Sequence, residues 1–145
     1  MDSATQVFNR RYYDEQLREL SGEYAVAMID VDNFKQVNDR FGHAAGDAAL
    51  YRVAQTMRSL LRSSDALVRY GGDEFLLLMP QLRPEGLPLV MDRIQEAVRQ
   101  AQVESHPEIR LSISVGGVCG VHPLREAIRQ ETLRKMEQEG ATPQP

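Results

Sequence analysis

The chain has 145 residues, of which 42% are hydrophobic, which is enough for one domain with a substantial buried core. A net charge of −4 argues against a general nucleic-acid or anionic-membrane binder, and the single cysteine, Cys119, excludes a disulfide framework. No apolar stretch approaches the roughly 20 residues of a membrane span, and the N-terminus lacks the apolar core of a signal peptide. We therefore expect a cytoplasmic domain.

Hydrophobic periodicity and turn residues predict helices and strands along the whole chain. In chain order, the predicted elements are a helix over 9–20, a strand over 24–31, helices over 33–42 and 47–62, strands over 66–70 and 75–79, a helix over 84–103, a strand over 110–120 and a helix over 124–140. We expect Gly42 to end the second helix with a left-handed cap and Asp47 to cap the third. This order predicts an α+β domain whose largely antiparallel central sheet is covered by helices.

Three acidic residues fall at the ends of predicted strands. Asp30 ends the first strand, and Asp73 and Glu74 lie in the turn between the second and third. If these strands are neighbours in one sheet, the carboxylates converge and repel one another unless a proton or a divalent cation neutralises them. Oxygen ligands favour Mg²⁺ or Mn²⁺, and clustered strand-end carboxylates are typical of a two-metal phosphoryl-transfer site. An ordinary acidic turn is the alternative, and the hairpin alone favours it.

Several motifs together resemble the GGDEF family of diguanylate cyclases. Residues 29–47 and 62–75 carry the longest matches, and the five letters of the family name stand unaltered at residues 71–75. Residues 2–11 and 111–117 also resemble family motifs. The resemblance extends from about residue 2 to residue 118 and implies a palm-like nucleotide cyclase fold.

The resemblance implies that two GTP molecules are condensed into cyclic di-GMP, with one GTP held by each of two facing domains. It also implies that acidic side chains and the Val31 carbonyl bind the metal ions, which we expect to be Mg²⁺ or Mn²⁺. Glu74 is the acid proposed to assist metal binding or activation of the 3′-hydroxyl. The implied catalytic and metal-binding side chains are those of Asp30, Asp73 and Glu74.

By the same resemblance, a further group of residues holds GTP. Asn38 and Asp47 match the pair that reads guanine, whose N1 and N2 donors suit a carboxylate acceptor. Lys35 and two backbone amides at a helix N-terminus match a phosphate cradle, and the hairpin glycines leave room for the nucleotide. The implied GTP-binding residues are Asn33, Phe34, Lys35, Asn38, Asp47, Gly71 and Gly72.

A second site is implied before the hairpin. Arg62 and Asp65 have the spacing of the family's inhibitory site for the product, cyclic di-GMP, and Arg93 resembles the further arginine that clamps the same ligand. An arginine fork and a carboxylate suit the phosphate and the guanine edge. A simple surface ion pair is the alternative for any arginine and aspartate at this spacing.

The predicted last helix departs from the family pattern. Aligned on Gly140, it has Gln130, Glu137 and Ala141 where the family has an aspartate, a lysine and an arginine, and those two cations hold the terminal phosphates of GTP. A glutamate in place of a cation replaces attraction by repulsion. The N-terminal motif also has Gln6 where a glycine is usual.

Two functions therefore stay open for this domain, which we expect to cover residues 1–140 with a flexible tail over 141–145. One is a working diguanylate cyclase, with activity reduced by the divergent last helix. The other is a module that binds cyclic di-GMP or GTP and signals through a partner. A template-dependent nucleotidyl transferase is disfavoured because no basic template-binding surface is evident.

Overall fold

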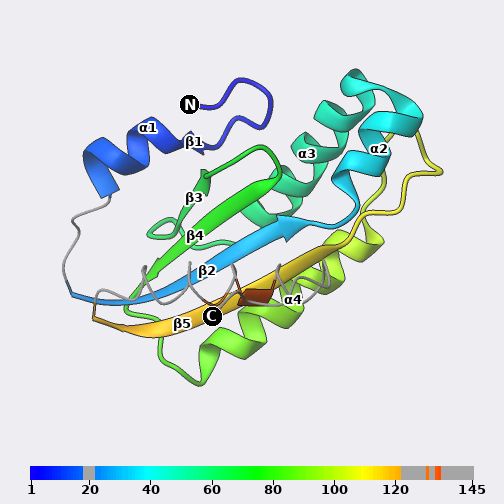
Figure 1. Cartoon of the computed structure of the whole chain (residues 1–145). Helices are drawn as coiled ribbons and strands as arrows, with labels where there is room; N and C mark the ends of the chain where they lie inside the picture. Colours follow the sequence, from blue (N-terminus) through cyan, green and yellow to red (C-terminus); the bar gives the residue numbers. More distant parts are fainter. Residues whose placement is uncertain (18–21, 122–129, 131–132, 135–145) are drawn as a thin grey trace, which may run out of the picture.

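The computed structural model describes residues 1–17, 22–121, 130 and 133–134 (Figure 1). Its centre is a five-stranded sheet in the order β1-β3-β4-β2-β5. The strands are β1 (Phe8–Asn9), β2 (Glu23–Val31), β3 (Ala66–Arg69), β4 (Glu74–Pro80) and β5 (Ile113–Val121). Every neighbouring pair is antiparallel except β1 with β3, which is parallel. The predicted α+β fold with a largely antiparallel sheet is confirmed.

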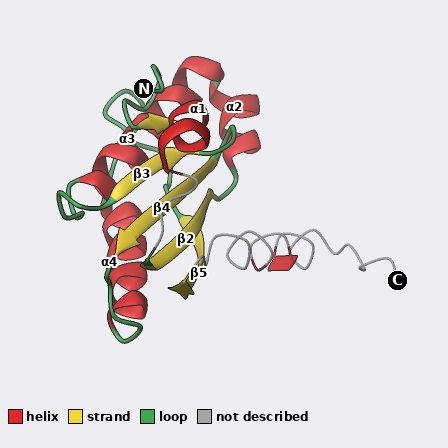
Figure 2. Ribbon diagram, turned by 90° about the vertical axis from the view of Figure 1, so that its left-hand side faces the viewer, coloured by secondary structure: helices red, strands yellow, loops and turns green. Residues whose placement is uncertain are grey.

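Helices cover both faces of the sheet, and Figure 2 shows α3 and α4 against one of them. The helices are α1 (Arg10–Tyr12), which continues as the π-helical turn η1 (Tyr13–Leu17), then α2 (Phe34–Phe41), α3 (His43–Arg58) and α4 (Gly86–Gln100). Within the described residues, none of these helices has both the length and the apolar character needed to cross a lipid bilayer.

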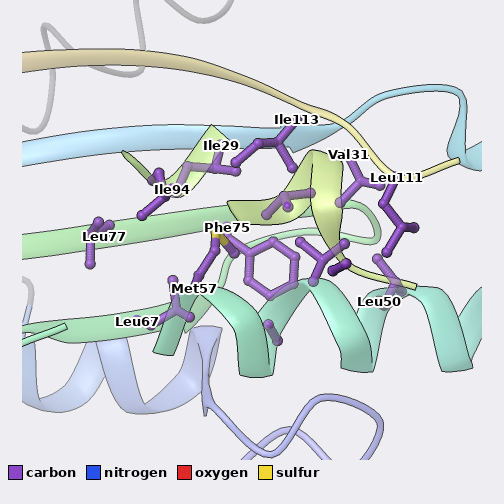
Figure 3. Close-up of a cluster of buried hydrophobic side chains, with 14 of the residues drawn as sticks. Ile29, Val31, Leu50, Met57, Leu67, Phe75, Leu77, Ile94, Leu111 and Ile113 are labelled. Atoms are coloured by element: carbon purple, nitrogen blue, oxygen red, sulfur yellow. The ribbon is translucent and has the colours of Figure 1, made fainter. Parts of the chain in front are cut away.

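The main core lies between the sheet and helices α3 and α4 (Figure 3). Leu50 and Met57 of α3 pack there against Phe75 of β4, and all three are fully buried. Burial of a side chain of this size stabilises the fold by about 1.5–3 kcal/mol. A smaller cluster on the opposite face packs Tyr13 of η1 against Val26 and other strand residues. Strand β2 is therefore buried on both faces, as its continuous apolar run predicts.

Strand β2 has a strict alternation that matters for the site. Its odd-numbered apolar residues, such as Ile29, belong to the main core, and Val26 and Met28 belong to the smaller cluster. Successive side chains of a strand point to opposite faces. Asp30 therefore lies on the face of Val26 and Met28, at the end of the strand that leads into α2.

The prediction that Asp47 caps the third helix is wrong. Helix α3 already begins at His43, so Asp47 lies inside it, and Gly42 is both the C-cap of α2 and the N-cap of α3. The two helices join without a loop because Gly42 has φ of +93°, a conformation that residues with a side chain rarely adopt. Gly42 ends α2 as predicted, but its ψ of +165° is not that of the expected left-handed cap.

Other element boundaries shift by a few residues. Helix α4 begins at Gly86, before Pro88, because a proline in the first turn lacks only an N–H that has no acceptor within the helix. The predicted N-terminal helix begins at Arg10 and becomes π-helical at Tyr13. The predicted last helix and tail lie outside the described residues, except for Gln130, Leu133 and Arg134.

Candidate functional site

The register of the sheet brings the acidic positions to one edge. Asp30 of β2 lies directly opposite Glu74 of β4, and the Val31 N–H donates to the Asp73 carbonyl at 2.9 Å. Residues directly opposite on antiparallel strands project to the same face with their Cβ atoms about 5 Å apart. The strand pairing therefore places the end of β2 beside the turn of the β3–β4 hairpin, which is the condition under which the acids were expected to converge (Figure 1).

The side chains do not form a three-carboxylate metal cluster. Among the described residues, no group of three His, Cys, Asp or Glu side chains lies close enough together to hold a metal ion. Asp30 and Asp73 line one pocket, whereas Glu74 does not line it. Magnesium in proteins commonly takes only one or two carboxylates and completes its octahedron with water and substrate phosphates. The oxygen ligands at this edge fit an ion that is bound together with a phosphate ligand.

The pocket between these acids and helix α2 has a volume of about 530 Å³. Its lining residues are Asp30, Val31, Asp32, Asn33, Phe34, Lys35, Gln36, Asp73, Ser112 and Ser114. The side chain of Asn33, the N-cap residue of α2, makes no capping hydrogen bond, and no acidic residue lies in the first turn of this helix. The first N–H groups of a helix have no partners within the helix and carry partial positive charge. This side of the pocket therefore attracts anions, while the acidic side attracts cations.

Helices α2 and α3 bring Asn38 and Asp47 into neighbouring places. The Oδ1 atom of Asn38 is buried and has no hydrogen-bond partner among the described residues. It lies so close to Gly46 that a Cβ at Gly46 would overlap with it. Asp47 follows Gly46 and is exposed. A buried acceptor without a partner costs about 1–3 kcal/mol, so this placement of the Asn38 side chain is unfavourable by itself.

The two glycines of the hairpin are not required by the protein's own packing. Neither Gly71 nor Gly72 has a positive φ. A Cβ on Gly72 would meet nothing within 4 Å, and a Cβ on Gly71 would make an ordinary contact of 3.4 Å with the Glu74 side chain. The space above the hairpin is therefore open to a ligand.

The turn before β3 holds Arg62 and Asp65 in contact with each other. The guanidinium of Arg62 donates to Asp65 at 2.8 Å and to the Pro80 carbonyl at 2.9 Å, and the Arg62 N–H donates to the same carboxylate at 2.8 Å. Arg93 is exposed on α4 and does not line the pocket next to this pair. The ion pair of the simpler reading is present, and the binding of product by all three residues stays a prediction.

Comparison with known proteins decides the family. The family model described as "Diguanylate cyclase, GGDEF domain" matches residues 1–139. The chain belongs to the GGDEF domain family. It is 46% identical over 104 residues to the probable diguanylate cyclase DgcE of Escherichia coli, a match that covers 67% of this chain. This GGDEF domain spans 9% of the length of DgcE and about a third of the length of several other curated relatives.

Solved structures show the same fold. The GGDEF domain of PA1120 (TpbB or YfiN) from Pseudomonas aeruginosa has a TM-score of 0.73 and 32% identity, over 81% of this chain and 74% of that one. The coiled coil and GGDEF domain of DgcB from Caulobacter crescentus, in complex with c-di-GMP, has a TM-score of 0.80 and 21% identity, over 97% of this chain and 82% of that one. The latter likeness concerns the fold alone.

Sequence reasoning about this GGDEF domain missed the residue that anchors the hairpin. Arg69 donates to the Gly72 carbonyl at 2.8 Å and to both oxygens of Asp2 at 3.1 Å. Burial by itself would raise the pKa of the Asp2 carboxyl, but hydrogen bonds from Thr5 and Arg69 together lower it. The motif that contains Asp2 and Thr5 was the available signal, although nothing in it indicates a contact with the hairpin. In the same turn, Gln6 has φ of +62°, which explains the usual glycine there.

Proposed function

We propose that this GGDEF domain is a diguanylate cyclase that condenses two GTP molecules into cyclic di-GMP and pyrophosphate. The observation that carries the proposal is the chemistry of the residues that line one pocket. On one side it has Asp30 and Asp73, and on the other the uncapped N-terminus of α2 with Lys35. A metal-bound triphosphate needs two kinds of partner close together: ligands for the metal ion and hydrogen-bond donors for the phosphate oxygens.

The residues divide the work by their chemistry. Asp30, Asp73 and the Val31 carbonyl would hold Mg²⁺ or Mn²⁺, with Glu74 beside them. When bound, such ions neutralise the charge of the triphosphate and activate an attacking hydroxyl. Glu74 would accept the proton of the 3′-hydroxyl, whose oxygen forms a bond to the α-phosphorus of the other GTP as the bond to pyrophosphate breaks.

Other residues of the pocket, together with residues outside its lining, would bind and orient the nucleotide. The amides of Asn33 and Phe34 and the ammonium group of Lys35 would donate to phosphate oxygens. Asn38 and Asp47 would read the Watson–Crick edge of guanine, for which the exposed Asp47 carboxylate provides an acceptor. The glycines at the tip of the hairpin would let the nucleotide lie close to the backbone.

Synthesis of a cyclic dinucleotide requires two copies of the domain, because each copy holds one GTP and the two must face each other. We place this catalytic homodimer in the cytoplasm, with the domain acting alone or as part of a larger, membrane-linked sensor. Product would bind at Arg62, Asp65 and Arg93 and inhibit.

A second candidate is a signalling module that binds GTP or cyclic di-GMP without turnover. The observation that favours it is the pair Glu137 and Ala141, which replaces the two phosphate-binding cations of the family's last helix. A glutamate near the terminal phosphates would weaken triphosphate binding by repulsion.

One incubation separates these functions. The chain is incubated with GTP and Mg²⁺, and chromatography then follows GTP, cyclic di-GMP and pyrophosphate. Appearance of both products, abolished by EDTA, supports the cyclase. Binding of GTP or cyclic di-GMP in calorimetry without any product supports the binding module. Failure to bind either nucleotide contradicts both functions.

A further inference from the structure

The third aspartate of the pocket, Asp32, accepts hydrogen bonds from two serines. Both oxygens of the Asp32 carboxylate accept hydrogen bonds, one from the Ser112 hydroxyl at 2.8 Å and one from the Ser114 hydroxyl at 2.6 Å. The Asp32 N–H also donates to the Ser112 carbonyl at 3.0 Å. Three hydrogen bonds therefore join the first residue after β2 to the beginning of β5. The resemblance to the family assigns no role to these three residues.

The sheet register explains why the serines reach Asp32. Ser114 lies directly opposite Asp30 across the β2–β5 pair, so Ser114, Asp30 and Asp32 belong to the same face. The hydroxyl of Ser114 nevertheless donates to Asp32. Two aspartates lie two residues apart on one face, and the serines hold the carboxylate of the second one against β5. This arrangement distinguishes Asp32 from Asp30, which lies opposite the hairpin acid Glu74.

Asp32 lies in the turn between β2 and α2, which sets the direction of helix α2. Asn33, the N-cap residue of α2, has φ of +60° and ψ of +26°, and its side chain makes no capping hydrogen bond. Asparagine tolerates this left-handed conformation better than most residues, but the conformation is strained for any residue with a Cβ. Without a capping side chain, the hydrogen bonds of the preceding residue, Asp32, contribute to the orientation of the first turn, together with the packing of Phe34 against the core. Residues 33–36 of that turn line the pocket.

The segment before β5 also contacts the far end of the same helix. The ring of His106 packs edge-on against Phe41, the last residue of α2, with 5.7 Å between the ring centroids. Helix α2 is therefore held at both ends by one segment, through Phe41 at its C-terminus and through Asp32 before its N-terminus.

We propose that Asp32 is a positioning residue for the triphosphate. Ser112 and Ser114 hold Asp32 in place through hydrogen bonds to its carboxylate. The three residues fix the turn between β2 and α2, so that the amides of the first turn and Lys35 point into the pocket. The hydroxyl donors also direct the negative charge of Asp32 toward β5 and away from the phosphates. This inference rests on the proposed function, because it concerns the binding of GTP at the same pocket.

Two readouts test this role in the full chain. The first is the affinity for α,β-methylene GTP with Mg²⁺, measured by calorimetry, since this analogue cannot react. The second is hydrogen exchange of the backbone amides of residues 32–37 without any nucleotide. The variants are Asp32→Ala, Asp32→Asn and the double change Ser112→Ala with Ser114→Ala. The matched control is Ser64→Ala, an exposed serine that lies outside both the pocket and the segment before β5.

Loss of two hydrogen bonds to a charged group is expected to weaken analogue binding about tenfold or more in Asp32→Ala and in the double serine variant. Exchange of residues 32–37 is expected to become faster in both. Asp32→Asn is expected to restore most of the affinity, because an amide can still bond with the serine hydroxyls. The Ser64→Ala control is expected to behave like the parent, and circular dichroism verifies that each variant is folded.

Two results would overturn the positioning role. If Asp32→Asn is as harmful as Asp32→Ala, the charge itself is required and Asp32 is a metal ligand. If exchange of residues 32–37 does not change in Asp32→Ala, the carboxylate does not hold the turn. If the parent chain itself fails to bind the analogue, the proposed function is wrong, and the exchange result still decides whether Asp32 holds the turn.

Discussion

Two groups of polar side chains in this domain differ in the partners that they use. Before β3, Arg62 and Asp65 bond with each other, and only 4% of the Asp65 side chain is exposed. Beyond β2, the N-terminus of α2 has no cap, and Asn38 Oδ1 has no partner within the described part of the chain. Lys35 takes part in none of the ion pairs formed among the described residues.

The difference indicates how each group can bind a ligand. A ligand at the pocket beyond β2 would satisfy groups that the protein leaves unsatisfied. A ligand at the Arg62 turn must compete with an existing ion pair and with the Pro80 carbonyl. Groups already paired inside the protein lose those bonds when they turn to a ligand, which offsets part of the gain. Binding at the pocket should therefore be the stronger of the two for equal contacts.

The largest expected effect is the loss of product formation when an acid of the pocket is replaced. Asp30→Asn or Asp73→Asn is expected to lower cyclic di-GMP formation by at least about 100-fold, because a lost metal ligand removes charge stabilisation from the transition state. Chromatography measures the product, and thermal unfolding verifies the fold. Asp92→Asn, an exposed aspartate of α4, is the control. Wild-type turnover in either pocket variant would contradict the assignment of these acids.

The next effect concerns the choice of base. Asp47→Ala is expected to weaken GTP binding by about 1–3 kcal/mol, because a guanine donor would be left without its acceptor. ATP binding should change much less, since adenine does not use this acceptor. Calorimetry with both nucleotides measures the difference. Equal losses for GTP and ATP would show that Asp47 does not read the base.

A change at the hairpin tip separates ligand binding from folding. Gly72→Ala is expected to leave the free energy of unfolding within about 0.5 kcal/mol of the parent value, since its Cβ would meet nothing within 4 Å. Its methyl group would crowd the nucleotide, at a cost of about 1–3 kcal/mol in GTP affinity. Urea unfolding and calorimetry test the two parts. Unchanged GTP affinity would place the nucleotide away from the hairpin.

A smaller effect, on the free energy of unfolding, compares the paired side chains before β3 with the polar residues beyond β2. Asp65→Ala is expected to lower the free energy of unfolding by about 1 kcal/mol, because Arg62 loses its ion pair and its N–H loses an acceptor. Asp47→Ala should change that energy by less than about 0.5 kcal/mol, since Asp47 is exposed. Urea unfolding measures both. Equal destabilisation by the two changes would remove the distinction drawn above.

The smallest expected effect is a dependence on pH. The pKa of Asp2 is lowered in the folded state from its ordinary value of 3.8, so its carboxylate stabilises the fold above that pH. This contribution is lost as the pH falls through the lowered folded-state pKa. Asp2→Asn should therefore flatten the loss of stability in acid, as measured by urea unfolding between neutral pH and pH 2. An unchanged acid limb would show that the bonds to Thr5 and Arg69 contribute nothing.

The sequence by itself determined the fold class, the central strand and the family. Continuous apolar residues identify β2, because a strand buried on both faces needs them at every position. The stretch around Gly71 to Phe75 identifies the hairpin and places acids at its tip. Gly42 identifies a helix end, because a positive φ favours glycine. Each of these signals depends on neighbouring residues, and local patterns carry such information well.

Only the tertiary structure decided which polar groups meet. Asp32 and Ser112 are 80 residues apart in sequence, and Asp2 and Arg69 are 67 apart. Their contacts depend on the pairing of distant strands and on the path of the N-terminal turn, which no local pattern contains. Asp47 also shows that a local pattern can mislead. Its residue type and spacing fit a helix cap, but the junction at Gly42 places it inside α3. Polar contacts between distant segments follow from the packing of the whole domain, because the position of each partner is set by a different set of neighbours.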